Sequence, residues 1–348
     1  MKGLILCAGR GTRLHPFSYS QPKTLLPVAN QPVLLHCIRK LLEVNVKDIG
    51  IMIHPSQNQI PEYLGDGSQY GATIRYIRQE SLLGIAHAVK IAQPFLQNEP
   101  FLLLLGDNLV MDSLSDLIHV FSQSQPDGIV MLSEVEKPQD YGIAEVYEGR
   151  LLSVAEKPVQ PKSNLAVIGV YLFTNRIFEA ITSLQPSSRG EYEITDAIQA
   201  MIERGCVIAH STAHGKYSDV GRIDRWLEAN QWMLIQELGN DFSIGKGSVI
   251  KDCKIIGPVL IGEGCHLENC RVGPYVSIQD GVQLSNCTHI ENSILLENCR
   301  LQDIDWKLQN SVFGRSSTVK GDAGKRTGVL IVSDKSSIHF PARGGDGF

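Results

Sequence analysis

The sequence has no long apolar run and no excess of basic charge, and each absence removes a class of function. Of its 348 residues, 43% are hydrophobic and 20% are charged, and the formal net charge is −5. Partners such as nucleic acids or anionic membranes favour a basic surface, so neither is expected. The most apolar run, Phe101–Leu105, is far short of the roughly 20 residues that cross a bilayer, so no membrane span is predicted.

The N-terminus lacks the features of a secretory signal. It begins with the strand-like run Gly3–Cys7, and no cleavage site follows. We therefore expect a cytoplasmic protein. The eight cysteines contain no Cys-x-x-Cys pair and no Cys/His cluster with zinc-ligand spacing. In a reducing compartment they are expected to be free thiols that pack as small apolar residues.

Residues 1–238 alternate strand-like and helix-like segments. Strands alternating with helices of about ten residues predict an α/β fold with a parallel or mixed sheet. The strand segments are continuously apolar, as expected for a sheet buried on both faces. The predicted strands are Gly3–Cys7, Ile49–Ile53, Ile74–Ile77, Phe101–Leu105, Ile129–Ser133 and Val167–Phe173, and the predicted helices are Val33–Leu42, Ile85–Phe95, Leu114–Phe121, Ile194–Ile202 and Trp226–Leu238. Ligands of such folds bind at the carboxyl ends of the strands.

From Gly239 onward the pattern changes, because aliphatic residues now recur every six positions with glycines between them. This period indicates a parallel β-helix built from hexapeptides. Cys253, Cys270 and Cys287 lie seventeen apart, so they would stack one per turn as packing residues. The aliphatic series is Ile255, Ile261, Leu267, Val272, Ile278, Leu284, Ile290 and Leu296, and it is expected to end near Leu301. We predict two domains, residues 1–238 and 239–348, and assign no role to residues 311–348.

A glycine-rich loop, Leu6-Cys7-Ala8-Gly9-Arg10-Gly11-Thr12-Arg13-Leu14, includes the end of the first predicted strand. Glycines let the backbone approach a phosphate and turn N–H groups towards it, and Arg13 and Lys23 add cations. A dinucleotide-binding loop would need a glycine at Leu14 and an acidic residue about twenty positions later, and both are missing. A P-loop would need Gly-Lys-Thr, whereas Pro22 precedes Lys23. By itself the loop fits a simple turn and a phosphate site equally well.

Two aspartates occupy positions suited to a metal ion. Asp107 closes the most apolar strand, and Asp219 comes just before a helix that starts near Ile223. An Asp at the end of a buried parallel strand can hold Mg²⁺ over a triphosphate. The alternatives are a turn residue for Asp107 and a helix N-cap for Asp219. Two carboxylates from separate loops suit nucleotidyl transfer, because Mg²⁺ prefers oxygen ligands and bridges phosphates.

Three further motifs are ambiguous by themselves. The amide of Gln79 could bind the edge of a base or lie exposed after a strand. The motif Glu156-Lys157-Pro158 pairs a hydrogen-bond acceptor with a cation, which suits a sugar phosphate but also a surface turn. Ser188 and Glu191 are predicted to form a capping box for the helix that runs on through Ile194.

In their order along the chain, these motifs resemble the sugar-1-phosphate nucleotidyltransferase family, and most closely its long-form glucose-1-phosphate thymidylyltransferase branch. The resemblance covers almost the whole chain, from Met1 into the repeats. Each motif is common alone, but eight in the family's order are specific: Gly9 to Leu14, Pro22-Lys23, Gln79 to Ala86, Gly106-Asp107-Asn108, Asp140-Tyr141-Gly142, Glu156-Lys157-Pro158, Glu191 to Asp196 and Asp219-Val220-Gly221.

The resemblance implies a fold, a reaction and a cofactor. The fold is a Rossmann-like nucleotidyltransferase domain with a mixed central sheet, followed by a C-terminal left-handed parallel β-helix. The reaction is transfer of a nucleotidyl group from dTTP, or alternatively UTP, to glucose 1-phosphate, which gives dTDP-glucose and pyrophosphate. Mg²⁺ is the implied cofactor, and its implied ligands are Asp107 and Asp219.

The resemblance also assigns residues to each substrate. It implies catalytic roles for Arg13, Lys23, Asp107 and Lys157. The implied nucleotide contacts are Leu6, Ala8, Gly9, Gly11, Thr12, Gln79 and Gly84, and the implied sugar contacts are Asn108, Gly142, Glu156, Val167 and Tyr171. The sequence departs from the family's pattern at Ser18, where Thr is usual, and at Leu82, which replaces a proline.

Two other classes of function remain as alternatives. A hexapeptide β-helix is also the fold of acyltransferases that use a catalytic histidine, and His266 and His289 are the histidines within the aliphatic series. A non-catalytic subunit would tend to lose the aspartate or the arginine that this chain keeps at Asp107 and Arg13. The flat sides of a β-helix suit self-association, so we expect a homo-oligomer.

Overall fold

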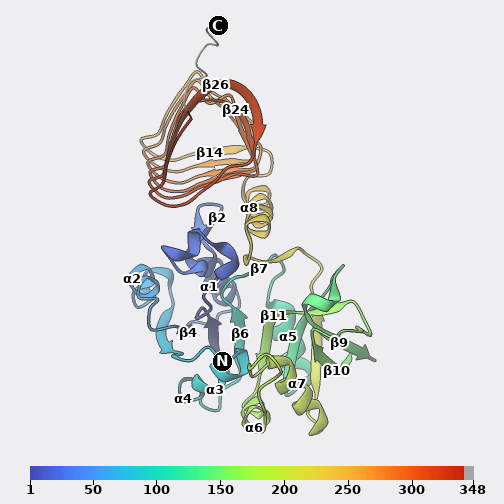
Figure 1. Cartoon of the computed structure of the whole chain (residues 1–348). Helices are drawn as coiled ribbons and strands as arrows, with labels where there is room; N and C mark the ends of the chain where they lie inside the picture. Colours follow the sequence, from blue (N-terminus) through green and yellow to red (C-terminus); the bar gives the residue numbers. More distant parts are fainter. Residues whose placement is uncertain (341–348) are drawn as a thin grey trace. The chain divides into compact units, whose positions relative to one another are not determined.

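A computed structural model describes residues 1–340, apart from the side chains of residues 322–325. The chain forms two compact units, drawn in Figure 1. Unit 1 contains Met1–Arg10 and Val33–Tyr217, and unit 2 contains Gly11–Pro32 and Ser218–Phe348. These units divide the chain differently from the two domains expected from the sequence, which stay a prediction.

Unit 1 is built on a mixed sheet of nine strands. In spatial order they are β5 (Thr73–Arg78), β4 (Asp48–Ile53), β1 (Lys2–Leu6), β6 (Phe101–Leu105), β11 (Leu165–Phe173), β8 (Gly128–Glu134), β12 (Ile208–Thr212), β10 (Arg150–Glu156) and β9 (Gly142–Tyr147). β1 is parallel to both β4 and β6, whereas β11 is antiparallel to β6 and β8. The expected α/β fold with a mixed sheet is therefore confirmed.

The helices of unit 1 bury apolar faces against this sheet. They are α1 (Val33–Glu43), α2 (Gln59–Leu64), α3 (Ile85–Ile91), α4 (Gln93–Leu96), α5 (Ser115–Ser124), α6 (Arg176–Thr182) and α7 (Ile194–Glu203). α3, α6 and α7 share one buried cluster with the strands, to which Val89, Ile177 and Ile198 belong. Among the described residues, no helix has both the length and the apolar content that crossing a membrane requires.

All six predicted strands of unit 1 are present, as β1, β4, β5, β6, β8 and β11. The prediction of one helix over Ile85–Phe95 is wrong, because the segment divides into α3 and α4. Pro94 lies in the first turn of α4, where its missing N–H costs nothing, whereas inside a continuous helix it would break a hydrogen bond. The hairpin of β9 and β10, the strand β12 and the helices α2 and α6 were not predicted.

Unit 2 joins residues 11–32 to the last part of the chain. The first segment contains η1 (Thr12–Leu14), η2 (Phe17–Tyr19), η3 (Lys23–Leu25) and the hairpin of β2 (Pro27–Val28) and β3 (Gln31–Pro32). It packs on α8 (Ile223–Leu238), where Trp226 Nε1 donates to the carbonyl of Pro27 at 2.6 Å. The buried Asn230 Oδ1 accepts hydrogen bonds from Ala29 N at 2.9 Å and from Ser277 Oγ at 2.7 Å. One amide of α8 therefore holds both the hairpin and the C-terminal strands.

The strands after α8 are short and pair in parallel. One sheet contains β14 (Phe242–Ile244), β17 (Val259–Ile261), β20 (Val276–Ile278), β23 (Ser293–Leu295), β25 (Val312–Phe313) and β27 (Ile331–Val332). Another contains β15 (Val249–Lys251), β18 (His266–Glu268), β21 (Gln283–Ser285), β24 (Arg300–Gln309), β22 (His289–Glu291), β19 (Arg271–Val272) and β16 (Lys254–Ile255), with β26 (Thr318–Gly328) and β28 (Ser337–His339) beside them. Figure 1 shows these strands curling round together.

The register of these strands explains the repeat in the sequence. Phe242 pairs with Val259, and Val259 pairs with Val276, so the chain returns to the same sheet after 17 residues. The aliphatic series from Ile261 to Leu296 is buried, as predicted, and Ile255 is half-buried. Lys254 N donates to the carbonyl of Cys270, and Arg271 N donates to that of Cys287. The cysteines therefore stack as expected, and all eight are free thiols.

The parallel strands continue beyond Leu301, where the regular aliphatic series ends. Parallel pairing continues through β25, β26, β27 and β28, up to His339. The spacing between paired residues grows, because Ile294 pairs with Val312 and Val312 pairs with Ile331. These longer returns hide the six-residue period, so the sequence pattern fades before the structure does.

Candidate active site

The glycine-rich loop leaves β1 at Leu6, and its start is tied to neighbouring strands of unit 1. The carbonyl of Leu6 accepts a hydrogen bond from Gly106 N at 2.9 Å, and Cys7 N donates to Met52 O at 2.8 Å. The side chain of Gln57 donates from Nε2 to the carbonyl of Cys7 at 3.0 Å. Ala8 is buried, whereas Gly9 is exposed. The loop therefore leaves the sheet along a fixed path and reaches solvent at Gly9.

In unit 2 the loop continues through Gly11, which adopts a left-handed backbone with φ 66° and ψ 33°. A Cβ atom there would lie 2.9 Å from Cβ of Lys23. Only glycine combines this backbone with so close an approach. The structure thus places Lys23, at the start of η3, directly against the glycine loop.

Arg13 and Asp219 are brought together in unit 2 around Gly221. A Cβ at Gly221 would lie 3.3 Å from Arg13 Nη2 and 3.3 Å from Asp219 Oδ2. A side chain at this position would therefore crowd both charged groups. Asp219 ends β13 (Tyr217–Asp219), and α8 starts four residues later with no side-chain cap. The alternative role of Asp219 as the N-cap of this helix is wrong.

Asp107 follows β6, as predicted, and Asn108 begins β7 (Asn108–Val110) in unit 1. Asn108 Nδ2 donates to the carbonyl of Ile168 at 2.7 Å. The next residue, Gly169, has φ 76°, and a Cβ there would lie 2.4 Å from Asn108 Nδ2. Here the pairing of β11 with β8 is also irregular. The amide of Asn108 is therefore anchored to a distorted point of β11.

Gln79 and Gly84, the expected base contacts, also lie together in unit 1. Gln79 Nε2 is 3.3 Å from the carbonyl of Gly84 and 3.1 Å from His87 Nδ1. Only 4% of Gln79 is exposed. The alternative of an exposed polar residue is therefore wrong, because the Gln79 amide is buried and orients the turn before α3.

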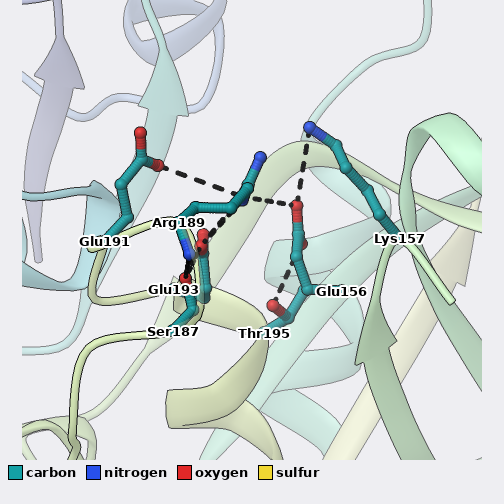
Figure 2. A network of polar contacts seen from close by, with 7 residues as sticks. All are labelled: Glu156, Lys157, Ser187, Arg189, Glu191, Glu193 and Thr195. Carbon is teal, nitrogen blue, oxygen red and sulfur yellow. Dashed lines mark hydrogen bonds and ion pairs between the residues drawn. The ribbon is translucent and has the colours of Figure 1, made fainter.

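Glu156 lies at the centre of a polar network at the end of β10, drawn in Figure 2. Its Oε1 is 3.1 Å from Arg189 Nη2 and 3.9 Å from Lys157 Nζ. Its Oε2 accepts a hydrogen bond from Thr195 Oγ1 at 3.1 Å. Arg189 also pairs with Glu193 at 2.8 Å. One carboxylate is thus held by a hydroxyl and two cations.

The burial of this network shifts the pKa of its central acid. Desolvation raises the pKa of Glu156, and the charge of Glu193 raises it further. The hydrogen bond from Thr195 and the charges of Arg189 and Lys157 act in the opposite direction but do not cancel the shift. Glu156 is therefore a half-desolvated acceptor, which strengthens its hydrogen bonds to a polar ligand.

Of the remaining residues expected to contact the sugar, Gly142 and Tyr171 lie near Glu156. Gly142 pairs with Glu156 across the β9–β10 hairpin, and a Cβ at Gly142 would lie 3.3 Å from Glu156 Oε2. Tyr171 on β11 is 3% exposed, and burial, followed by the charge of Glu156, raises its pKa. Val167 lies on the same strand, next to the residue that pairs with Ile143 of β9. The structure therefore brings Gly142 and Tyr171 to Glu156, although the three residues come from three strands.

The predicted capping box of Ser188 and Glu191 is wrong. α7 begins only at Ile194, after Glu193, and no side chain caps it. Ser187 takes the structural role instead, with its Oγ donating to Glu193 Oε1 at 2.8 Å and its N donating to the carbonyl of Glu191 at 2.8 Å. This turn brings Arg189 to Glu193, with which it forms an ion pair at 2.8 Å.

Three residues of the site were missed by sequence reasoning. Arg189 and Thr195 carry the Glu156 network, and Gly169 makes room for Asn108. The only local signal was Gly169, since a glycine inside a strongly apolar strand often marks a bulge or a close approach. Nothing near Arg189 in the sequence indicates a partner 33 positions away.

The two residues expected to bind the metal ion, Asp107 and Asp219, both offer carboxylates. Among the side chains that the structure describes, no group of three or more from His, Cys, Asp or Glu is arranged to hold a metal ion. Asp107 and Asp219 provide hard oxygen donors of the kind that Mg²⁺ binds, usually through one or two carboxylates plus substrate phosphates. The donor chemistry of these two residues therefore fits Mg²⁺.

Comparison with known proteins gives consistent results. The model of the nucleotidyl transferase family matches residues 2–235. The chain is 41% identical over 262 residues to the low-salt glycan biosynthesis nucleotidyltransferase Agl11 of Haloferax volcanii, which covers 74% of this chain and 72% of that one. It is 36% identical over 275 residues to a glucose-1-phosphate thymidylyltransferase of Streptomyces griseus, with 75% and 78% covered.

A solved structure agrees with these sequences. It is a Bacillus anthracis protein named as a glucose-1-phosphate thymidylyltransferase and crystallised with sucrose. The TM-score is 0.63 and the identity 33%, and the match covers 67% of this chain and 94% of that one.

Proposed function

We propose that this chain, which belongs to the nucleotidyl transferase family and is a sugar-1-phosphate nucleotidyltransferase, joins dTTP to glucose 1-phosphate to give dTDP-glucose and pyrophosphate. The carrying observation is the family match over residues 2–235, together with the thymidylyltransferase among its relatives. The gathering of Gly142, Tyr171, Lys157 and Arg189 around Glu156 supports a sugar phosphate as the second substrate.

In this proposal the glycine-rich loop binds the triphosphate. The backbone of Leu6, Ala8, Gly9, Gly11 and Thr12 would contact the nucleotide, and Arg13 and Lys23 would neutralise its phosphates. The close approach of Lys23 to Gly11 supports this assignment, because it places the aliphatic stem of a cationic side chain against backbone suited to phosphate. Gln79 and Gly84 would contact the base.

The sugar phosphate is assigned to the region around Glu156. Glu156 would accept hydrogen bonds from sugar hydroxyls, and Asn108, Gly142, Val167 and Tyr171 would shape the space. Two cations already pair with the Glu156 carboxylate, Lys157 and Arg189. A phosphate bound beside them could accept charge-assisted hydrogen bonds from these two side chains, which favours its binding.

The chemistry needs little beyond positioning. An oxygen of the sugar phosphate attacks the α-phosphorus of the triphosphate in line, and the bond to the β-phosphate breaks to release pyrophosphate. The attacking oxygen is already anionic, so no general base is required. Arg13 would stabilise the charge that grows on the leaving group. Mg²⁺, held by Asp107 and Asp219, would supply further neutralisation of the phosphate oxygens when bound.

The finer features of the architecture belong to the same proposal. Residues 1–238 would form the catalytic domain, and the parallel strands of residues 239–348 would form a left-handed β-helix. The 17-residue returns between strands such as β14 and β17 support this. We propose that the flat sides of these strands mediate a homo-oligomer.

The proposal is tested by measuring pyrophosphate release. The enzyme, with Mg²⁺, is given each nucleoside triphosphate in turn with a panel of sugar 1-phosphates, and reactions without sugar phosphate serve as controls. We expect the fastest release from dTTP with glucose 1-phosphate. Faster release from UTP would favour the uridylyltransferase alternative, and no release from any pair would refute nucleotidyl transfer.

A further inference from the structure

Three polar groups of unit 2 form a directed chain behind the glycine-rich loop. Ser18 Oγ donates to the carbonyl of Gly11 at 2.7 Å, and His15 Nδ1 lies 3.0 Å from the same hydroxyl. A serine hydroxyl can donate only one proton, and here that proton is donated in the hydrogen bond to the Gly11 carbonyl. His15 must therefore donate its Nδ1 proton to Ser18 Oγ. The ring of His15 is held by stacking on Tyr19, with centroids 3.8 Å apart and planes 5° from parallel.

This chain fixes one peptide plane of the loop. The Gly11 carbonyl also accepts a hydrogen bond from Leu14 N at 2.9 Å, so both of its lone pairs are used. A trans peptide is planar, and its C=O and N–H point in opposite directions. Holding the Gly11 carbonyl against Ser18 therefore aims the N–H of Thr12 the other way.

The Thr12 amide is available for a ligand. Thr12 is exposed, and among the described residues its N–H has no hydrogen-bond partner. Gly11 permits many backbone conformations, so its peptide plane could otherwise rotate and change the direction of the Thr12 N–H. The two hydrogen bonds on its carbonyl remove that freedom.

We propose that His15 and Ser18 are positioning residues that aim the Thr12 N–H at the triphosphate by holding the Gly11 carbonyl. The inference rests on the proposed nucleotidyl transfer. A preorganised donor is worth most where charge develops during the reaction, so losing its aim should lower turnover more than substrate binding.

The first test compares two substitutions of Ser18. Ser18→Ala removes the donor to Gly11, and we expect kcat to fall about ten-fold, the effect of one hydrogen bond of ordinary strength. Ser18→Thr keeps the hydroxyl and should stay within about two-fold of wild type, since the same hydrogen bond is retained. KM for the sugar 1-phosphate should be unchanged in both. Ser20→Ala is the matched control, because it removes a nearby hydroxyl that hydrogen-bonds to Phe17 O and to Asp334.

The second test asks whether His15 acts through Ser18. His15→Asn retains a side-chain N–H close to the position of Nδ1 and should keep most of the activity, whereas His15→Ala should lower kcat. Groups acting in series are not additive. The double variant His15→Ala/Ser18→Ala should therefore be no slower than Ser18→Ala alone.

The outcomes separate this inference from the proposed function. Wild type without pyrophosphate release would refute the proposed function. Active wild type with unchanged kcat in a folded Ser18→Ala variant would overturn the positioning role. A fall in kcat that Ser18→Thr does not rescue, or strictly additive effects of the two alanines, would also overturn it. Thermal unfolding followed by circular dichroism identifies any variant that is merely less folded.

Discussion

Gly169 is the residue where the local rules of a strand are broken most clearly. It lies in β11 with φ 76°, and a Cβ there would meet Asn108 Nδ2 at 2.4 Å. Gly149, in the turn after β9, has nearly the same φ of 77° but has no atom within 4 Å of its Cβ position. Substitution of these two glycines therefore distinguishes the energetic cost of backbone strain from the added cost of a steric contact.

We expect Gly149→Ala to lower the free energy of unfolding by about 1 kcal/mol, the strain of a left-handed L-residue. Gly169→Ala should cost about 2 kcal/mol more, because overpacking is added. Urea unfolding of both variants measures the difference. Equal losses would mean that Asn108 moves away freely, and the contact would then not constrain the site.

Charged residues carry the proposed chemistry, and two of them give a direct test. Asp107→Asn and Arg13→Ala should each lower turnover at least ~10²-fold, a magnitude typical of removing a group that stabilises transition-state charge. Asp116→Asn on α5 and Arg39→Ala on α1 are controls, because both side chains are exposed and outside the proposed site. Steady-state pyrophosphate release measures all four. Near-normal turnover in either site variant would refute the catalytic role proposed for that residue.

At the scale of elements, the β9–β10 hairpin holds two glutamates with opposite shifts. Burial raises the pKa of Glu156. On the neighbouring strand, Lys162 and then Ser153 lower the pKa of Glu145 by binding its carboxylate. The same hairpin thus provides a test and its own control.

A carboxyl whose pKa is raised by folding favours the folded state at low pH and loses that contribution as pH rises through its folded pKa. The stability of wild type relative to Glu156→Gln should therefore fall as pH rises above about 4.3, the ordinary value for Glu. For Glu145 the sign reverses, because its contribution is present above that pH and lost as pH falls. The stability of wild type relative to Glu145→Gln should accordingly increase with pH. Thermal unfolding measured from about pH 3 to about pH 7, a range that brackets the ordinary pKa of Glu, gives both dependences of stability on pH. Slopes of the same sign would contradict the opposite pKa shifts of Glu156 and Glu145.

The elements also mark how far local patterns predict structure. Apolar runs located all six predicted strands, because burial on both faces leaves an unbroken apolar signal. The prediction of one helix over Ile85–Phe95 was wrong because Pro94 lies in the first turn of a separate helix. The rule that proline interrupts a helix could have been applied to the sequence beforehand. The predicted capping box of Ser188 and Glu191 failed for another reason, since α7 begins only at Ile194 and the turn before it is held by contacts of Arg189 and Ser187 with Glu193.

At the scale of the whole molecule, one buried apolar cluster lies in unit 1 and another lies in unit 2. The second extends to Phe313 and Val332, beyond the point where the sequence repeat fades. Phe313 is fully buried and pairs with Leu295 and Val332. Residues after 311, to which the sequence assigned no role, therefore contribute to this core.

This predicts a large effect from one substitution in the last strands. Phe313→Ala should lower the free energy of unfolding by about 3–5 kcal/mol, the usual result of truncating a buried phenylalanine. Val329→Ala, at a side chain 56% exposed, should change it by no more than about 0.5 kcal/mol. Calorimetry of both variants measures the difference. A small effect of Phe313→Ala would show that the last strands add little to the core.

The sequence by itself determined the alternation of strands and helices, the six-residue aliphatic repeat and the order of the family motifs. These are local or periodic signals, and burial writes them directly into the pattern of apolar residues. Only the tertiary structure decided that Arg189 and Thr195 hold Glu156 and that Gly169 yields to Asn108. Those contacts join residues tens of positions apart, and no local period encodes which distant side chain a loop will meet. The same holds for the Ser18 hydroxyl, whose hydrogen bond to Gly11 depends on how η1 and η2 fold back on the loop.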